Sequence, residues 1–248
     1  MTQFFRQAGV TYTQSAKLVH RLNGNTGRIN TMTLSTDGAR LVSASLAVNH
    51  DAHYGLSTEE EYNVNPPDKT IRLWDTKAGL SIRILHGLAS SVDSLPFTRD
   101  GKILAAAYEN GIVQSWDTAT GQALLPLEYE PSSSSTLDGE TFHLDVAFSS
   151  DGKTISCTFP DGDLRLRDIT SGGLLTVLDN RMILKSARFS PNGKLLATTS
   201  NGHMVQLWKP ITGELLGVYK GLKGLSIGSS DDGHSLDTET GQLNLGVI

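Results

Sequence analysis

Short stretches in which apolar and polar residues alternate recur along the chain, always in the same order. Residues 71–74, 113–116, 164–167 and 205–208 carry apolar side chains at most alternate positions. A period of two is typical of a β-strand with one packed face. Further apolar stretches precede and follow each of these segments, so each unit contains four predicted strands. The pattern favours an all-β chain built from one repeated unit.

Two turn signals punctuate the repeat. An Asp-Gly or Asn-Gly pair follows the first strand of each unit and supplies the positive φ that tight hairpin turns require. These pairs begin at Asp37, Asp100, Asp151, Asn192 and Asp232. A Trp-Asp-like pair closes the third strand, and it begins at Trp74, Trp116, Arg167 and Trp208. In the last three units 16 positions separate the two signals, and such equal intervals indicate a structural repeat.

The strand before each turn is predicted to be buried. Eleven of the twelve residues that lie eight, five and three positions before the turn in the four units are apolar. In the first unit these residues are Ile29, Met32 and Leu34. Four short strands in a unit of about 41 residues, the distance from Arg167 to Trp208, are typical of a β-propeller blade.

The stretches Asp68–Asp75 and Phe189–Ser200 resemble WD-repeat (WD40) sequence. The resemblance implies one all-β domain, a WD40-type β-propeller with four complete four-stranded blades and a partial fifth. The expected blades are residues 28–85, 90–127, 142–178, 183–219 and, in part, 224–248. The tail, residues 234–245, is similar to WD-repeat regions at the C-terminal end of fungal NACHT-type signalling proteins.

The resemblance also implies structural roles for the residues that mark the repeat. The residues expected to hold the blades together are Trp74, Asp75, Trp116, Asp117, Asp168, Trp208, Asp68 and Asp161. In WD repeats a His, a Ser or Thr, an Asp and the Trp form a hydrogen-bonded network, but Asn25 and Leu88 stand where the His is expected here. Because only the first unit keeps Ser43 or Ser45 together with Asp68 and Trp74, we expect modest stability per blade.

Two insertions interrupt the regular spacing. Residues 46–66 lie between the second and third strands of the first unit, and residues 129–140 lie between the outer strand of one unit and the inner strand of the next. Both connections leave the same face of an up-and-down blade, and binding commonly resides in long loops on a rigid scaffold. This face is therefore the predicted partner-binding surface. Its candidate residues are Tyr54, Glu59, Glu60, Glu61, Tyr62 and Tyr129.

The 248 residues are too few for seven such units, so the ring is expected to be small or to stay open. Residues Ala16–Leu22 look like an outer strand without its own blade, and in WD-repeat rings such a strand completes the last blade. If the ring stays open, its unpaired edge strands favour a partner, self-association with a second copy, or a longer parent chain.

Composition excludes several classes of function. The net charge is −5 and no basic run occurs, which argues against a nucleic-acid partner. No stretch reaches the ~20 apolar residues of a membrane span, and the single cysteine, Cys157, forms no internal disulfide. A cytoplasmic protein without a membrane partner is expected.

No arrangement of residues predicts catalysis, a cofactor or a metal. A phosphate-binding loop is missing, and His50, Asp51 and His53 lack the further ligands of a zinc site. His143 and Cys157 are interpreted as strand residues. The leading hypothesis is a non-enzymatic protein-interaction scaffold or ligand-sensing module. The alternative is a hydrolase with a site in the central channel, where His143 or Asp145 would act.

Overall fold

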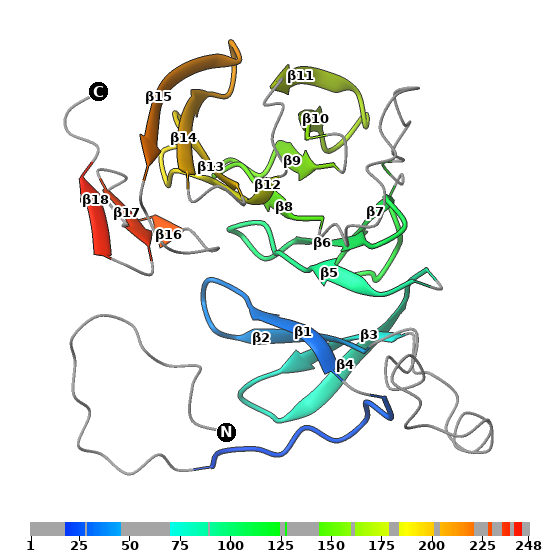
Figure 1. The fold of residues 1–248 in the computed structure, drawn as a ribbon. Coiled ribbons are helices and arrows are strands. Elements are labelled where there is room, and N and C mark those ends of the chain that lie inside the picture. Colours follow the sequence, from blue (N-terminus) through cyan, green and yellow to red (C-terminus); the bar gives the residue numbers. More distant parts are fainter. Residues whose placement is uncertain are drawn as a thin grey trace, which may run out of the picture.

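Five antiparallel sheets fan out in sequence order around a common centre (Figure 1). The computed structural model describes residues 18–27, 29–45, 70–88, 90–124, 127, 144–159, 162–178, 184–200, 204–220, 228–229, 235–238 and 241–244. Within these residues there is no helix, and hence none long and apolar enough to cross a membrane.

Each blade is formed by consecutive strands that pair antiparallel with their neighbours. The first blade contains β1 (Ile29–Leu34), β2 (Arg40–Ser45), β3 (Thr70–Asp75) and β4 (Leu80–His86). The second contains β5 (Val92–Ser94), β6 (Ile103–Tyr108) and β7 (Val113–Asp117). The third contains β8 (Val146–Phe148), β9 (Thr154–Thr158), β10 (Leu164–Asp168) and β11 (Leu174–Leu178). The fourth contains β12 (Leu184–Phe189), β13 (Leu196–Ser200), β14 (Met204–Lys209) and β15 (Glu214–Lys220). The partial fifth contains β16 (Gly228–Ser229), β17 (Ser235–Thr238) and β18 (Gly241–Asn244).

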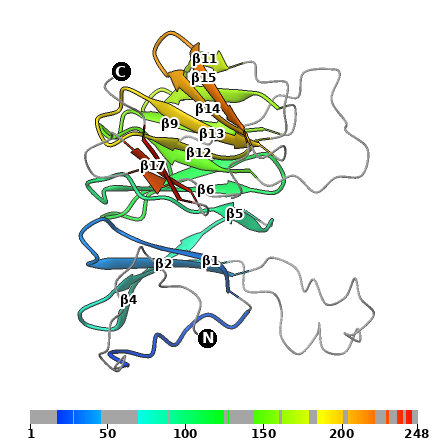
Figure 2. The same ribbon diagram turned by 60° about the vertical axis from the view of Figure 1, so that its left-hand side comes forward.

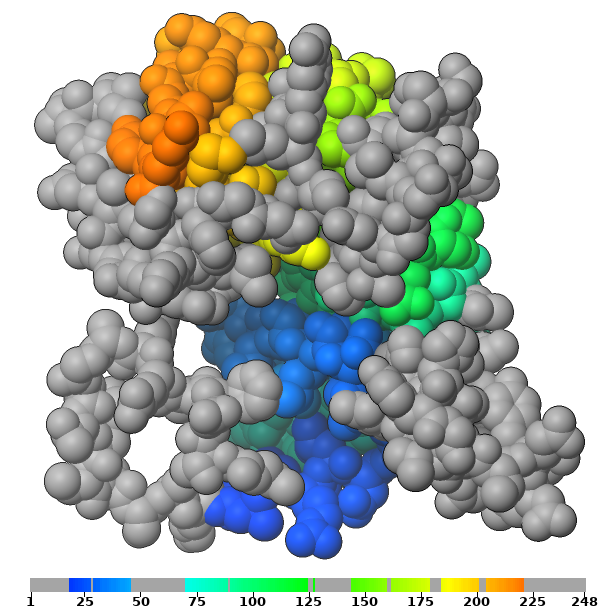
Figure 3. All heavy atoms as spheres, in the orientation of Figure 1, coloured from blue at the N-terminus to red at the C-terminus, as the bar shows by residue number. Residues whose placement is uncertain are grey.

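The predicted all-β propeller with a partial fifth blade is confirmed, and the sheets formed by the described residues do not close into a ring. In the second blade the outer strand is reduced to two bridges, Trp116 with Ala123 and Val113 with Leu127. Figure 2 shows the same stack turned, with the strands of successive blades lying one above another. Figure 3 shows the first blade (blue) and the fourth (orange) at opposite ends of the described surface.

In the described residues the core consists of four apolar clusters, three of which lie between successive blades, while the fourth, with Ala197, Val205 and Leu207, lies within the fourth blade. The first and second blades bury Leu73, Val92 and Trp116 in one cluster. The second and third share another, and the third and fourth share a third, which contains Leu166 and Trp208. Where neighbouring blades cover a sheet, the apolar positions of its inner and middle strands are mostly buried, whereas several in the outer strands β4, β11 and β15 are exposed.

The first blade departs from this rule, which corrects the expectation that its inner strand is buried. Ile29, Met32 and Leu34 are 48%, 55% and 50% exposed, whereas their equivalents Val92 and Leu95 in the second blade are 3% and 4% exposed. The physical reason is that no blade precedes the first one in the described part of the chain. The apolar pattern is the same, but no neighbouring sheet covers it.

Residues 18–22, which belong to the expected outer strand Ala16–Leu22, form no strand and pair with none of the described strands. A ring nitrogen of His20 instead bonds to the carbonyl of Lys77, 2.9 Å away, in the turn between β3 and β4. Gly79 in the same turn lies against the His20 side chain. Its equivalent in the fourth blade, Gly213, packs against the outer strand β11 of the preceding blade. Residues 18–22 therefore lie where the outer strand of a preceding blade would lie, without a sheet to join.

The inner hairpin turns share one hydrogen-bonding arrangement. Asp100 accepts a hydrogen bond from Thr98 Oγ1 at 2.8 Å and another from the Lys102 N–H at 3.1 Å. Gly101, which follows, has φ of 67°, a conformation that glycine adopts without strain. In the fourth blade Asn192 replaces the aspartate and accepts the same two bonds, from Ser190 Oγ at 2.7 Å and from the Lys194 N–H at 3.0 Å.

These turns predict a loss of stability in acid. Side-chain hydrogen bonds from Ser35, Thr98 and Ser149 hold the pKa values of Asp37, Asp100 and Asp151 below the ordinary 3.8. A lowered folded-state pKa means that the contribution is present above pH 3.8 and is lost as the pH falls through the folded-state values.

We expect the triple variant Asp37→Asn, Asp100→Asn, Asp151→Asn to keep its turns, as the natural Asn192 does, and to show a flatter decline of the urea midpoint below pH 4. Urea titrations of both proteins from neutral pH to about pH 2 measure the difference. Parallel curves for the two proteins would contradict the prediction.

Candidate functional site

The predicted partner-binding residues lie outside the described part of the chain. This holds for Tyr54, Glu59, Glu60, Glu61, Tyr62 and Tyr129, and also for His50, Asp51, His53 and His143. Among the repeat markers, Asp68 and Asp161 lie outside it as well. The structure therefore bears on the surface that carries these residues only through the strands that flank them.

The strand ends that flank both insertions are described. Ser45, the last residue of β2, pairs with Ile29 at the start of β1, so residues 46–66 leave the first blade at that end. Leu127 pairs with Val113 at the start of β7, so residues 129–140 leave the second blade at the matching end. The Asp-Gly turns of β1–β2 and β5–β6 lie at the opposite end of each sheet.

The described tryptophans of the Trp-Asp-like pairs are buried within the blades. Trp74 donates a hydrogen bond from Nε1 to Ser43 Oγ at 3.0 Å, and Ser43 donates to Asn25 Oδ1 at 2.9 Å. Asn25 donates in turn to Ser45 Oγ at 2.8 Å. Asn25 thus stands in the network at the place where the sequence pattern expects a histidine, and its short amide side chain connects both serines.

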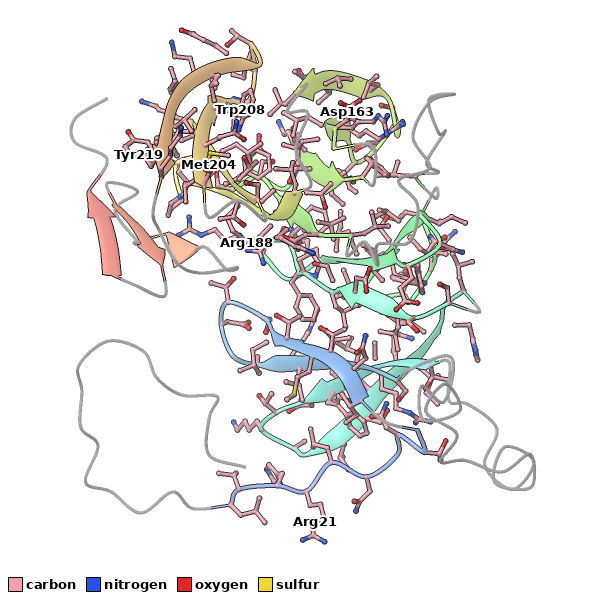
Figure 4. All side chains as sticks on the ribbon, in the orientation of Figure 1. Arg21, Asp163, Arg188, Met204, Trp208 and Tyr219 are labelled. Carbon is pink, nitrogen blue, oxygen red and sulfur yellow. The ribbon has the colours of Figure 1, made fainter. Side chains whose placement is uncertain are left out.

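A second such pair corrects the expectation that only the first unit keeps a donor and an acceptor together. Trp208 Nε1 donates to Thr198 Oγ1 at 3.1 Å inside the fourth blade, and Figure 4 shows Trp208 within that sheet. In the third blade Arg167 and Cys157 stand where the Trp and the Ser or Thr would be. In the fourth unit Gly202 stands where the aspartate is expected, so the sequence pattern alone does not indicate Thr198 as the partner of Trp208.

The aspartates of the Trp-Asp-like pairs close the outer hairpins. Asp75 accepts hydrogen bonds from the N–H groups of Lys77 and Ala78, both at 2.8 Å. Asp117 and Asp168 accept equivalent bonds in the next two blades. The hydrogen bonds from Thr120 and Ser171 lower the pKa values of Asp117 and Asp168. These carboxylates are therefore turn-forming groups.

A cavity of about 450 Å³ lies among the inner strands, where the channel of a propeller runs. Its lining comes from β1, β5, β8 and β12 together with adjoining residues, and it includes three threonines of the first blade, Thr31, Thr33 and Thr36. The charged residues in the lining are Asp93, Asp145 and Arg188. Figure 4 places Arg188 near the middle of the molecule, beside the inner strands.

Asp145 joins three blades at this cavity. Its carboxylate accepts hydrogen bonds from Ser94 Oγ of the second blade at 2.7 Å and from the Ala187 N–H of the fourth at 3.0 Å. Arg188 Nη1 of the fourth blade lies 2.6 Å from Asp145 Oδ2 in a salt bridge. With the side chain only 9% exposed and donors on both oxygens, this carboxylate is held in place as a structural group.

The other groups in the described residues that could react or bind a metal show no catalytic arrangement. Burial raises the pKa of the Cys157 thiol to about 12, so the thiolate that a nucleophile requires is scarce at neutral pH. No group of three or more His, Cys, Asp or Glu that could hold a metal ion occurs in the part of the chain that the structure covers.

Comparison with known proteins shows what parts of the chain resemble. The family model described as WD domain, G-beta repeat matches residues 16–75 and 174–209. The β-propeller domain of Cps50 (Swd1) from Myceliophthora thermophila superposes with a TM-score of 0.66 and 16% sequence identity, and the match covers 85% of this chain and 61% of that one. Residues 16–75 and 174–209 are thus similar to WD40 repeats, and the fold is that of a β-propeller.

Three curated relatives show the range of similar proteins. WD repeat-containing protein VIP3 of Arabidopsis thaliana is 31% identical over 50% of this chain and 40% of its own length. Target of rapamycin complex subunit wat1 of Schizosaccharomyces pombe is 29% identical over 57% of this chain and 42% of its own. The guanine nucleotide-binding protein subunit beta of Zea mays is 28% identical over 57% and 38%. In each case the match spans less than half the length of the relative.

Proposed function

We propose that this chain is a non-enzymatic protein-interaction scaffold that binds its partner through the sheet ends from which residues 46–66 and 129–140 depart. One observation carries the proposal: the blades use their apolar faces to pack against one another, so the ends of the sheets and their loops remain for recognition. Similar proteins include, by their names, a subunit of the target of rapamycin complex and a guanine nucleotide-binding protein subunit beta. The sequence further supports a cytoplasmic location and a sensor role of the kind found in fungal NACHT-type proteins.

The hydrolase alternative has no support in the channel. A general base needs a lone pair directed at the substrate, and Asp145 gives its oxygens to Ser94, Ala187 and Arg188. Asp93 accepts a hydrogen bond from the Leu144 N–H at 2.9 Å. Both carboxylates thereby connect neighbouring blades, which is a scaffolding role.

The test replaces residues 46–66 with a short Gly-Ser loop in one variant and residues 130–139 in another. Bound proteins are recovered with each variant and with the unchanged chain and quantified by mass spectrometry. A control variant, Lys77→Ala, alters an exposed turn at the other end of the first sheet. We expect at least one loop replacement to remove partners that the control retains. Undiminished recovery with both loop variants would refute the assignment of this face.

We also propose that a second copy covers the exposed apolar face of β1. Ile29, Met32 and Leu34 occupy positions whose equivalents are buried by a neighbouring blade in the next units. Sedimentation velocity at increasing protein concentration tests this: Met32→Asp should shift the chain toward the monomer. A monomer at every concentration for the unchanged protein would refute self-association.

A further inference from the structure

The junctions between successive blades differ at one repeated position. Arg40, Ile103 and Thr154 each lie three residues after the turn aspartate and pair with the aspartate that ends the third strand. Each faces a residue of the next blade, namely the residue that directly follows the Trp-Asp-like pair of that next blade. Those facing residues are Thr118, Ile169 and Pro210 in the three successive junctions.

The first two junctions are filled by long side chains. Arg40 Nη1 donates to Thr118 Oγ1 at 2.7 Å and to the Gly101 carbonyl at 3.1 Å, which ties the first blade to the second. Ile103 and Ile169 belong to the apolar cluster between the second and third blades. A well-packed junction of this kind leaves no space for a ligand.

The third junction is open. Thr154 is too short to reach across to Pro210, and both residues line a cavity of about 410 Å³ between the third and fourth blades, which we call the junction cleft. Leu166, Leu175 and Phe189 supply its apolar walls. The cleft opens at the end of the sheets that carries the Asp151-Gly152 and Asn192-Gly193 turns, opposite to the end from which the two insertions depart.

The rim of the junction cleft is apolar as well. Ile211 is 90% exposed at the tip of the β14–β15 turn, and Leu175 is 55% exposed beside it. The residues equivalent to Ile211 in the other blades are Lys77, Ala119 and Thr170. Ile211 and Leu175 therefore extend the apolar lining of the cleft to its rim, and largely apolar walls are typical of binding sites.

The lining gives the junction cleft a negative charge. Among the described residues of the lining, Asp151 is the charged one. The Ser149 hydroxyl and the Lys153 N–H both donate to its Oδ1, at 2.6 and 3.0 Å, which leaves Oδ2 for a further donor. Ser149, Ser150 and Phe189 also line a second cavity, of about 630 Å³, toward the ring centre. The two cavities therefore share one wall, and a bound cation is expected at the Asp151 end because Arg99 lines the second cavity.

We propose that the junction cleft binds an extended peptide in which a branched aliphatic side chain stands next to a lysine or arginine. The aliphatic group enters the space that Thr154 leaves open and packs on Leu166 and Phe189, and Ile211 covers it from the rim. The neighbouring cation pairs with Asp151. This surface goes beyond the proposed function, because it lies on the other face of the propeller.

A random synthetic octapeptide library, selected on the immobilised full chain and read by mass spectrometry, tests the proposal. We expect enrichment of Leu, Ile or Val beside Lys or Arg. Thr154→Arg, which copies the filled first junction, and Ile211→Lys, which copies the first blade, should each reduce recovery of these peptides about tenfold. Ile82→Thr, an exposed position of the first blade, is the matched control and should change nothing.

A separate variant tests the role of the Asp151 charge. Asp151→Asn keeps the turn, as Asn192 shows, and should remove the preference for Lys or Arg while the aliphatic preference remains. Ile211→Lys alters only an exposed turn tip, so its result stands even if Thr154→Arg lowers the unfolding midpoint. The proposal is overturned if no motif is enriched, if the motif is acidic, or if Ile211→Lys and Thr154→Arg retain the enriched peptides as well as Ile82→Thr does.

Discussion

Replacing Asp145 with alanine is expected to lower the free energy of unfolding by about 3 kcal/mol. The change leaves the buried Ala187 N–H without an acceptor and removes the partner of Ser94 Oγ. A buried donor without a partner costs about 1–3 kcal/mol, whereas the contribution of the Arg188 salt bridge is reduced because that side chain is 40% exposed. Urea unfolding measures the difference, and the second, third and fourth blades should lose stability together.

Glu214→Ala is the control for this prediction. It removes a salt bridge of similar length, 2.8 Å to Lys209, in which the side chains are 47% and 55% exposed. Such a pair contributes about 0–1 kcal/mol, so Glu214→Ala should leave the urea midpoint nearly unchanged. Equal effects of Asp145→Ala and Glu214→Ala would show that Asp145 does not connect the blades as its hydrogen bonds indicate.

The positions of the strands could be predicted from the sequence because the turns demand particular residues. Gly101, Gly152 and Gly193 all have φ near 70°, and the polar residue before each bonds to the turn. Fixed spacing between such turns then fixes the strand register. The local chemistry is repeated in every blade, so each copy supports the interpretation of the others.

The contacts that each blade makes with its surroundings could not be predicted in this way. Met32 and Leu95 occupy equivalent positions and are both apolar, yet one is exposed and the other buried. The role of Asn25 depends on the two serines that the fold brings to it, and Thr198 is found only by following the sheet from Trp208. The junction cleft requires side-chain lengths to be compared across two blades, which no single repeat contains.

Because β1 is exposed in the first blade, substitutions at equivalent positions of the first and second blades should differ in their effect on stability. Leu95→Ala removes a side chain that is 4% exposed and packed between two blades, and it should cost about 2–5 kcal/mol. Met32→Ala removes a side chain that is 55% exposed at the equivalent position. At low protein concentration, where a second copy does not bind, Met32→Ala should change the free energy of unfolding by less than about 0.5 kcal/mol.

Measuring the free energy of unfolding of both variants at high protein concentration shows whether a second copy covers β1. If a second copy packs on β1, the cost of Met32→Ala rises with concentration, because association stabilises only the folded state. Leu95→Ala should cost the same at both concentrations. A large cost of Met32→Ala even at the lowest concentration would contradict the structure, since it would mean that another part of the same chain covers β1 and that the ring closes in solution.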